Sequence, residues 1–317
     1  MTTLHILLGL VLLVAGGDLL VRGGTSLARR LGVSNLMIGL TLVGFGTSTP
    51  ELITSLDAAF AGSPGIAVGN VVGSNTANIL LILGLAALVH PIATPPTMMR
   101  RDGTAVLVAA VACLVVVLMG ELERWVGVVL VAVLIAYVGF TYLREHTGST
   151  AELPSPDGLP IDNPHSAPLA LALALIGLVL SFFGAHLLVT GAISLAATLG
   201  ISETIVGLTV VAVGTSLPEL AASLVAAARR QSDIAIGNIL GSNIYNVLGI
   251  LGVTAIVKPI PVPDVIARLD IWVMLAATVA MLVFARTGRC LSRREGAVFV
   301  LAYAGYVGYL ATHLGTS

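Results

Sequence analysis

Two stretches of this chain share one pattern: Gly46-Thr47-Ser48-Thr49-Pro50-Glu51 and Gly214-Thr215-Ser216-Leu217-Pro218-Glu219. Each places a glutamate inside a long apolar segment, after two hydroxyl side chains and a proline. In each case an asparagine, Asn78 or Asn246, follows the glutamate by 27 residues. Because a carboxylate is costly to bury in hydrocarbon, both motifs predict a functional site.

The composition predicts a polytopic helical membrane protein. Of 317 residues, 57% are hydrophobic and only 10% are charged, and the mean hydropathy is +1.03. A soluble domain carries about 25% charged residues. A transmembrane barrel would show alternating segments of about ten residues, whereas residues 125–143 form one uncharged run. We therefore expect an all-α protein whose first partner is the lipid bilayer.

Several other classes of protein are disfavoured by the same sequence. The net charge is -1 and there is one lysine, which does not suit a nucleic-acid partner. Cys113 and Cys290 form neither a metal-binding spacing nor a disulfide framework. No nucleophile–base constellation is present, so we expect neither an enzyme nor a bound cofactor. The oligomeric state is open, and a monomer is plausible.

Gly, Pro and charged residues divide the chain into ten expected membrane spans. The first is expected to be a retained helix, because Asp18 interrupts any signal-peptide pattern. A proline-rich linker, 144–167, separates a first unit, 1–143, from a second unit, 168–317. The expected spans are 4–28, 34–60, 65–89, 103–120, 124–143, 168–198, 203–228, 234–256, 269–286 and 296–313.

The two units are repeats of each other. A shift of 168 residues superimposes Glu51 on Glu219, Gly73-Ser74-Asn75 on Gly241-Ser242-Asn243, and Pro91 on Pro259. Each repeat holds five expected spans, an odd number, so the second must enter the membrane from the opposite side. The sequence therefore predicts two inverted five-helix repeats, a plan common in secondary transporters.

The distribution of basic residues predicts the orientation. With the N-terminus outside, the inner connections hold eleven Arg residues and the outer ones hold three Arg or Lys. Because basic residues concentrate on the cytoplasmic side, we expect the 144–167 linker in the cytoplasm and the protein in the plasma membrane.

The polar residues of the motifs suit a hard cation. Helical spacing places Thr47, Ser48 and Glu51 on one face, and Pro50 frees backbone carbonyls before it. The third and eighth expected spans carry matching stripes, Asn70, Ser74, Asn78 and Asn238, Ser242, Asn246. Carboxylate, hydroxyl, amide and backbone oxygens are the ligands of Ca²⁺, and the same oxygens can hold Na⁺. For the glycines and for Asn75 and Asn243, a packing or capping role is about as plausible as a ligand role.

At these motifs the chain resembles the cation/calcium exchanger superfamily, and within it the prokaryotic sodium/calcium exchangers. The resemblance covers nearly the whole chain. It implies ten helices, an outside N-terminus, a cation site between the second, third, seventh and eighth helices, and first and sixth helices that slide. Gly16, Gly17, Gly23, Gly24, Gly184 and Gly191 would suit the sliding contacts. The implied ligands are Thr47, Ser48, Glu51, Ser74, Asn78, Thr215, Ser216, Glu219, Ser242 and Asn246, with the backbone carbonyls of Gly44 and Ala212.

The expected function is therefore an antiport of Na⁺ against Ca²⁺ by alternating access, in which the sodium gradient drives calcium out. Some potassium-dependent members carry Asp where this chain has Asn246, which puts potassium co-transport in doubt. The alternative is a calcium/proton exchanger, since Glu51 and Glu219 can also carry protons. The Thr-Ser pair before Pro-Glu favours sodium, because hydroxyl groups add oxygens for a second cation. An ion channel fits less well, because paired carboxylates would retain calcium.

Overall fold

The structure is a computed structural model that describes residues 2–60, 62, 64–147, 166–198, 212–264 and 266–314. Almost all of these residues are helical, and the few strands have two residues each. The linker that the sequence places at 144–167 lies largely outside the described residues, as does the start of the seventh expected span.

The first half of the chain begins with a long helix and continues through helices that contain π-helical turns, here labelled η. Its elements are α1 (Thr2–Leu31), α2 (Asn35–Ile38), η1 (Gly39–Val43), α3 (Gly44–Thr47), α4 (Thr49–Phe60), α5 (Pro64–Ala77), η2 (Asn78–Leu83), α6 (Gly84–Val89), β1 (Ile92–Ala93), α7 (Pro96–Met98), η3 (Met99–Gly103), α8 (Thr104–Met119), β2 (Glu121–Leu122) and α9 (Arg124–Thr147).

The second half follows the same order. Its elements are α10 (Ala167–Thr198), α12 (Ala212–Thr215), α13 (Leu217–Ala228), α14 (Ser232–Ile244), η5 (Tyr245–Leu251), α15 (Gly252–Val257), β3 (Ile260–Pro261), η6 (Ile266–Asp270), α16 (Ile271–Gly288), β4 (Cys290–Leu291) and α17 (Arg293–Leu314).

Seven helices of the described chain are long and apolar enough to cross a membrane. An eighth is added if Asn35–Thr47 and Thr49–Phe60, which meet at a bend of 41°, form one broken span. Two other expected spans are not among these seven helices. The helix α13 is shorter than a membrane span, and α17 is rich in tyrosine and glycine. The protein is thus an integral membrane protein of mostly helical structure.

Two of the spans form the centre of the molecule. In Gly65–Val89 and Ser232–Val257, 78% and 83% of the most apolar window is buried, against 28% in Arg124–Arg144. These two spans carry the Asn and Ser stripes recognised in the sequence. Polar side chains on a helix so enclosed have neither water nor headgroups to contact, so their partners must come from the protein or from a bound ion.

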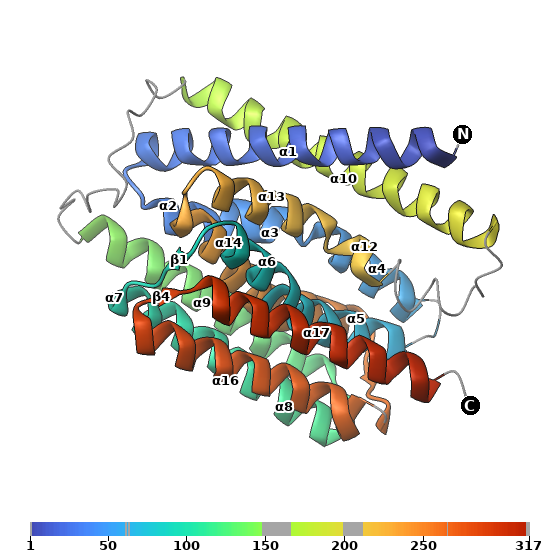
Figure 1. The fold of residues 1–317 in the computed structure, drawn as a ribbon. Helices are drawn as coiled ribbons and strands as arrows, with labels where there is room; N and C mark the ends of the chain where they lie inside the picture. The colour runs from blue at the N-terminus through green and yellow to red at the C-terminus, as the bar shows by residue number, and fades with distance from the viewer. Residues whose placement is uncertain are drawn as a thin grey trace.

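The long helices α1 and α10 lie antiparallel along one side of the molecule (Figure 1). They approach closely at Gly16 and Gly23, where a Cβ atom would lie 2.7 Å from the Gly177 carbonyl oxygen and 2.5 Å from the Ala174 nitrogen. Only small residues allow helix backbones to come this near. Gly9 belongs to the same contact, and sequence reasoning missed it, as it missed Gly177.

The expectation for the six glycines needs one correction. Gly184 and Gly191 also lie against α1, at Leu13 and Ile6 respectively. Gly17 instead faces Ala221 and Val225 of α13, and Gly24 faces Ile38 and Val43. These two point away from the contact, because positions one residue apart lie about 100° apart around a helix.

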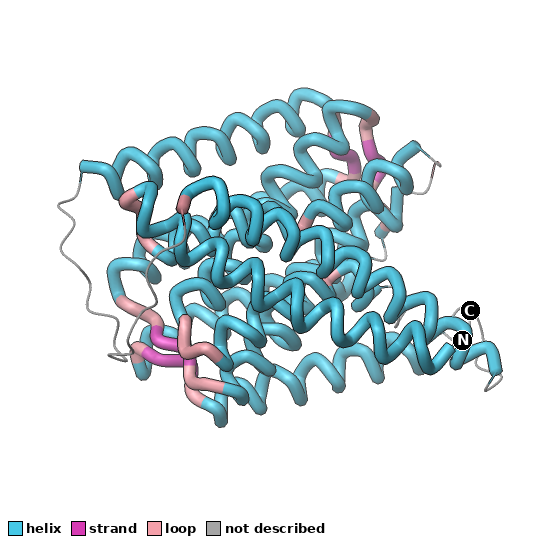
Figure 2. The backbone as a smooth tube through the Cα atoms, turned by 90° about the horizontal axis from the view of Figure 1, so that it is seen from above, coloured by secondary structure: helices cyan, strands magenta, loops and turns pink. Residues whose placement is uncertain are grey.

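Four short strands, which the sequence did not predict, join the two halves. β1 pairs with β4 and β2 pairs with β3, both antiparallel. The repeat shift superimposes β1 on β3, yet the two pairs lie at opposite ends of the molecule (Figure 2). Each pair is extended by a further backbone hydrogen bond, Thr94 N to Arg289 O at one end and Val262 N to Gly120 O at the other, both 2.9 Å.

Candidate cation site

Both signature motifs interrupt a helix at the same residue. Ser48 has φ -82° and ψ 9°, and Ser216 has φ -88° and ψ 9°, outside the regular α-helical range. A proline follows two residues later in each motif; it offers no N–H to the preceding turn and disfavours helix at the residue before it. The interruptions therefore bring the serine hydroxyl groups of the two halves to equivalent places.

The two serines cross between the halves of the chain to bind the two glutamates. Ser48 Oγ donates to Glu219 Oε1 at 2.8 Å, and Ser216 Oγ donates to Glu51 Oε1 at 3.0 Å. Both carboxylates are completely buried. A separation of 3.4 Å also joins Ser216 Oγ to Ser74 Oγ. Each half of the chain thus positions the acid of the other.

Asn70 and Asn238 hold the helices that carry the glutamates. Asn70 Nδ2 donates to the Glu51 backbone oxygen at 3.1 Å, and Asn238 Nδ2 donates to that of Glu219 at 3.2 Å. Each also donates to a serine one turn further along, Ser55 at 3.0 Å and Ser223 at 2.8 Å. These amides fix the backbone at the two acids.

The hydroxyl groups around Gly44 complete one side of the site. Thr47 Oγ1 donates to Val43 O at 2.9 Å and lies 3.3 Å from Asn238 Oδ1. Ser242 Oγ donates to the Gly44 carbonyl oxygen at 3.1 Å. In the second half Ala212 begins α12 and Thr215 ends it, directly before Ser216.

The asparagines of the site lie on the two central helices, at or beside π-helical turns. Asn78 is the first residue of η2 and Asn246 the second of η5. Asn78 Nδ2 donates to Asn243 Oδ1 at 3.1 Å, and Asn246 Nδ2 donates to Asn75 Oδ1 at 3.0 Å. π-helical turns are rare and are frequent at functional sites, because they re-aim the side chains around them.

Four buried oxygen atoms in this region have no hydrogen-bond partner: Glu51 Oε2, Glu219 Oε2, Asn78 Oδ1 and Asn246 Oδ1. They form two pairs related by the 168-residue repeat. In the described part of the chain, neither glutamate has an Arg, Lys or His ion-pair partner. A buried acceptor without a donor costs about 1–3 kcal/mol, and a buried charge costs more. A bound cation would remove this cost.

The structure therefore connects most of the residues that the sequence selected. Hydrogen bonds join Gly44, Thr47, Ser48, Glu219 and Ser242 into one network through Asn238, and Glu51, Ser74 and Ser216 into another. The amide pairs place Asn78 and Asn246 on the two central helices. Ala212 and Thr215 lie on α12, which ends directly before Ser216.

Two further acids, the buried Asp102 and the half-buried Asp270, occupy equivalent places that sequence reasoning did not use. Tyr137 donates to Asp102 Oδ1 at 2.9 Å, and Tyr306 donates to Asp270 Oδ1 at 2.7 Å. Asp102 also pairs with Arg101. The repeat shift superimposes Asp102 on Asp270, and that coincidence was the available signal. Both pairs tie a membrane helix to its neighbour, away from the signature motifs.

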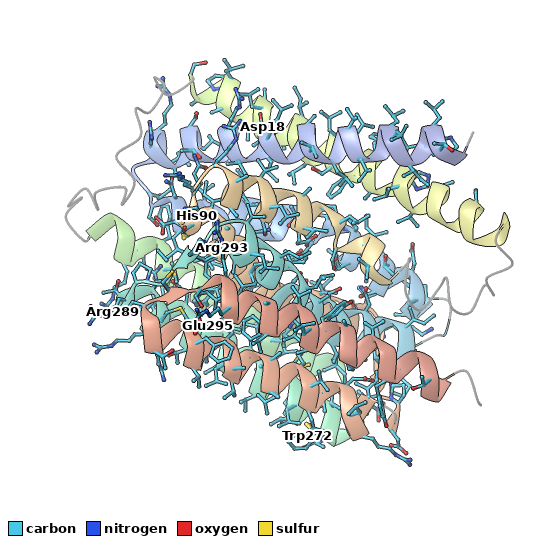
Figure 3. All side chains as sticks on the ribbon, viewed as in Figure 1. Asp18, His90, Trp272, Arg289, Arg293 and Glu295 are labelled. Atoms are coloured by element: carbon cyan, nitrogen blue, oxygen red, sulfur yellow. The ribbon has the colours of Figure 1, made fainter. Side chains whose placement is uncertain are left out.

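Asp18, which the repeat leaves without a matching acid, is an ion-paired residue. It lies on α1 (labelled in Figure 3) and accepts hydrogen bonds from Arg22 on the same helix and from Arg229 at the end of α13. Arg22 is half exposed. The charge of Asp18 is thus compensated, unlike those of Glu51 and Glu219.

Fold and site define a class: a helical membrane protein of two similar halves, in which a serine of each half binds the buried acid of the other. The family model described as "Sodium/calcium exchanger protein" matches residues 1–143 and 169–312, and the chain belongs to this family.

Curated relatives and solved structures agree with this assignment. The chain is 38% identical to a "Putative antiporter CaxA" of Alkalimonas amylolytica over 96% of this chain and 97% of the relative. It is 37% identical to the "Sodium/calcium exchanger MaX1" of Methanosarcina acetivorans, again over 96% and 97%. A structure of the sodium-calcium exchanger NCX_Mj, soaked with Na⁺ and Sr²⁺, matches with a TM-score of 0.83 at 34% identity, covering 97% of each chain.

Proposed function

We propose that the protein is an antiporter that exchanges Na⁺ for Ca²⁺ across the plasma membrane, with calcium extrusion driven by the sodium gradient. The observation that carries this proposal is the set of four unpartnered buried oxygens on Glu51, Glu219, Asn78 and Asn246. Two carboxylates neutralise one divalent ion, and oxygen ligands suit Ca²⁺ and Na⁺ alike. The names of the relatives, above all the sodium/calcium exchanger MaX1, support sodium as the second ion.

The proposed ligands are those that the sequence selected. Carboxylates, amides and hydroxyls from both halves supply oxygen atoms, and two backbone carbonyls add to them. The set is Thr47, Ser48, Glu51, Ser74, Asn78, Thr215, Ser216, Glu219, Ser242 and Asn246, with the carbonyl oxygens of Gly44 and Ala212.

Ten spans in two inverted repeats, 1–143 and 168–317, are proposed as the frame of this site. Two features support this frame. The repeat-related strands β1 and β3 lie at opposite ends of the molecule (Figure 2). The start of α1 and the end of α17 lie at one end, away from β1 and β4 (Figure 1). An even number of spans gives that placement of the two helix ends.

The end of the molecule with β1 and β4 is proposed to face the cytoplasm, together with the 144–167 linker. Arg289 and Arg293 are gathered there, with His90 and Glu295 close by (Figure 3). Arg293 donates to the last carbonyl of α6, that of Val89, at 3.2 Å. A surplus of arginine marks the cytoplasmic side of a membrane protein.

Alternating access is proposed to use the contact between α1 and α10. Glycines on both helices bring backbone against backbone at Gly9, Gly23 and Gly184. At these positions the glycine projects no side chain into the neighbouring helix, which favours displacement of one helix along the other.

The test is calcium uptake into proteoliposomes that hold Na⁺ inside, at equal pH on both sides. We expect ⁴⁵Ca²⁺ uptake that requires outward-directed Na⁺ and reverses when the Na⁺ gradient is reversed. Uptake that ignores Na⁺ and follows an imposed pH gradient would show a calcium/proton exchanger instead. A steady conductance without a counter-ion would show a channel.

A further inference from the structure

Asn75 and Asn243 are not proposed as ligands of the cation. Each contacts an asparagine that is: Asn75 contacts Asn246, and Asn243 contacts Asn78. All four lie on the two central helices and are almost completely buried. We propose that Asn75 and Asn243 are positioning residues that hold the amides of Asn246 and Asn78 with their oxygens directed to the cation. This inference rests on the proposed function. We call the four residues the asparagine brace.

The orientation of one half of the brace follows from a backbone group. Asn75 Nδ2 donates to the backbone oxygen of Asn243 at 3.2 Å. A backbone carbonyl can only accept, so the nitrogen of Asn75 must point to it and Oδ1 must point away. Asn75 Oδ1 in turn lies 3.0 Å from Asn246 Nδ2. Since Oδ1 can only accept, Asn246 must present its nitrogen here and its own oxygen on the other side.

The other half has the same contact between two amides but lacks the backbone anchor, because Asn243 Nδ2 has no hydrogen-bond partner in the described part of the chain. Asn78 Nδ2 donates to Asn243 Oδ1 at 3.1 Å, which leaves Asn78 Oδ1 without a partner. Thus both freed oxygens, those of Asn78 and Asn246, belong to residues whose nitrogens are occupied across the repeat. An amide that was free to turn would present N–H to a cation in some of its orientations, and N–H repels a cation.

The brace also accounts for an amide at position 246. A deprotonated aspartate there would place a second acceptor against Asn75 Oδ1, and two acceptors repel each other. Asparagine supplies the donor that Asn75 requires. The brace therefore keeps the acidic charge of the site with Glu51 and Glu219, which matches the charge of one Ca²⁺.

The test is a double-mutant cycle on Na⁺-driven ⁴⁵Ca²⁺ uptake in proteoliposomes, with the half-saturating Ca²⁺ concentration as the readout. We expect Asn75→Ala to raise the half-saturating Ca²⁺ concentration roughly fivefold, which corresponds to the loss of one hydrogen bond. We expect Asn246→Ala to raise this concentration by at least as much. The double variant should match Asn246→Ala alone, because Asn75 acts through Asn246. The control is Thr76→Ala, whose buried hydroxyl bonds to Val72 O of its own helix; it should leave the value unchanged.

Additive effects in the cycle, or a change in maximal rate without a change in half-saturation, would overturn the inference. If Asn75→Ala does not fold, Asn75→Ser serves in its place, because its hydroxyl is too short to span both contacts. The mirror cycle of Asn243→Ala with Asn78→Ala must give the same non-additivity. Wild-type vesicles without Na⁺-dependent uptake would refute the proposed function itself, whereas active wild-type vesicles with an additive cycle refute only the brace.

Discussion

At the scale of single residues, the site is built from reciprocal contacts. Ser48 donates to Glu219 and Ser216 donates to Glu51, so that each acid is held by the opposite half of the chain. The second oxygen of each carboxylate has no partner in the protein. Buried acids so arranged are costly without a counter-ion, and a cation between the halves would stabilise both.

Replacing either acid by its amide should abolish calcium exchange. Glu51→Gln and Glu219→Gln keep the side-chain volume and an acceptor for the serine, but each removes one of two charges. The attraction between a carboxylate and a cation in near contact is worth about 4 kcal/mol at an effective dielectric constant of about 20. We therefore expect Na⁺-driven ⁴⁵Ca²⁺ uptake to fall at least roughly 100-fold. Asp57→Asn is the control, since Asp57 is an exposed acid on the same helix α4. Uptake close to wild type in both Gln variants would contradict the proposed site.

The two serines should be of equal importance. Ser48→Ala and Ser216→Ala each remove one hydrogen bond to a buried carboxylate, worth about 1.5–3 kcal/mol. We therefore expect each to raise the half-saturating Ca²⁺ concentration by roughly 10- to 100-fold, and by similar amounts, measured by Ca²⁺ titration of Na⁺-driven uptake. Thr278→Ala is a suitable control, because it removes a buried hydroxyl that bonds to Met274 O of its own helix α16. Loss of function in only one of the two serine variants would argue against reciprocal roles.

At the scale of elements, broken helices and small residues decide what the protein can do. The interruptions at Ser48 and Ser216 turn side chains and backbone toward the centre, while unbroken helices surround them. The pair of α1 and α10 is held close by glycine and alanine backbones, as are α9 with α15 at Gly127 and Gly252 and α6 with α17 at Gly84 and Gly296. Small residues let helix backbones approach this closely.

Gly23→Ala should damage the contact between α1 and α10 more than Gly24→Ala does. At Gly23 the added Cβ would lie 2.5 Å from the Ala174 nitrogen and 2.6 Å from the Ala170 oxygen, both backbone atoms that cannot turn aside. At Gly24 the nearest atom, Ile38 Cγ2, lies 3.1 Å away on a side chain. Overpacking costs about 1–3 kcal/mol, so Gly23→Ala should lower the unfolding temperature and the exchange rate. The unfolding temperatures of the two variants are measured after purification in detergent. Equal decreases for Gly23→Ala and Gly24→Ala would contradict this geometry.

At the scale of the whole molecule, the two halves are interlocked rather than merely joined by a linker. Each strand pair takes one strand from each half, and both central helices contribute to the site. The two pairs lie at opposite ends (Figure 2), as we expect for the proposed inverted repeat. We therefore expect the two ends of the molecule to open to different sides of the membrane.

Cysteine labelling tests this orientation. In a background without Cys113 and Cys290, Glu123→Cys near β2 should react with a membrane-impermeant maleimide in intact cells. Thr287→Cys near β4 should react only after permeabilisation. Both positions are exposed, so the membrane and not burial decides their access. Labelling of both from the same side would contradict the inverted arrangement.

Much of this could be predicted from the sequence because the signals are chemical and periodic. Acids such as Glu51 and Glu219 in apolar runs, and a 168-residue register of polar positions, are properties of the chain itself. They indicate a membrane protein, its repeat and the residues that concentrate at the centre. The helical spacing of polar residues places Asn78 and Asn246 on polar stripes, and the family resemblance selects both as proposed oxygen ligands.

Only the tertiary structure decided which partners meet. No local pattern states that Ser48 donates to Glu219 rather than to Glu51 on its own helix, because that depends on how two distant helices cross. The strand pairs are too short for a periodic signal, and Asn75 and Asn243 have local sequences that suit packing equally well. Hydrogen bonds between segments about 170 residues apart are set by packing, and packing turned the two motifs into one site.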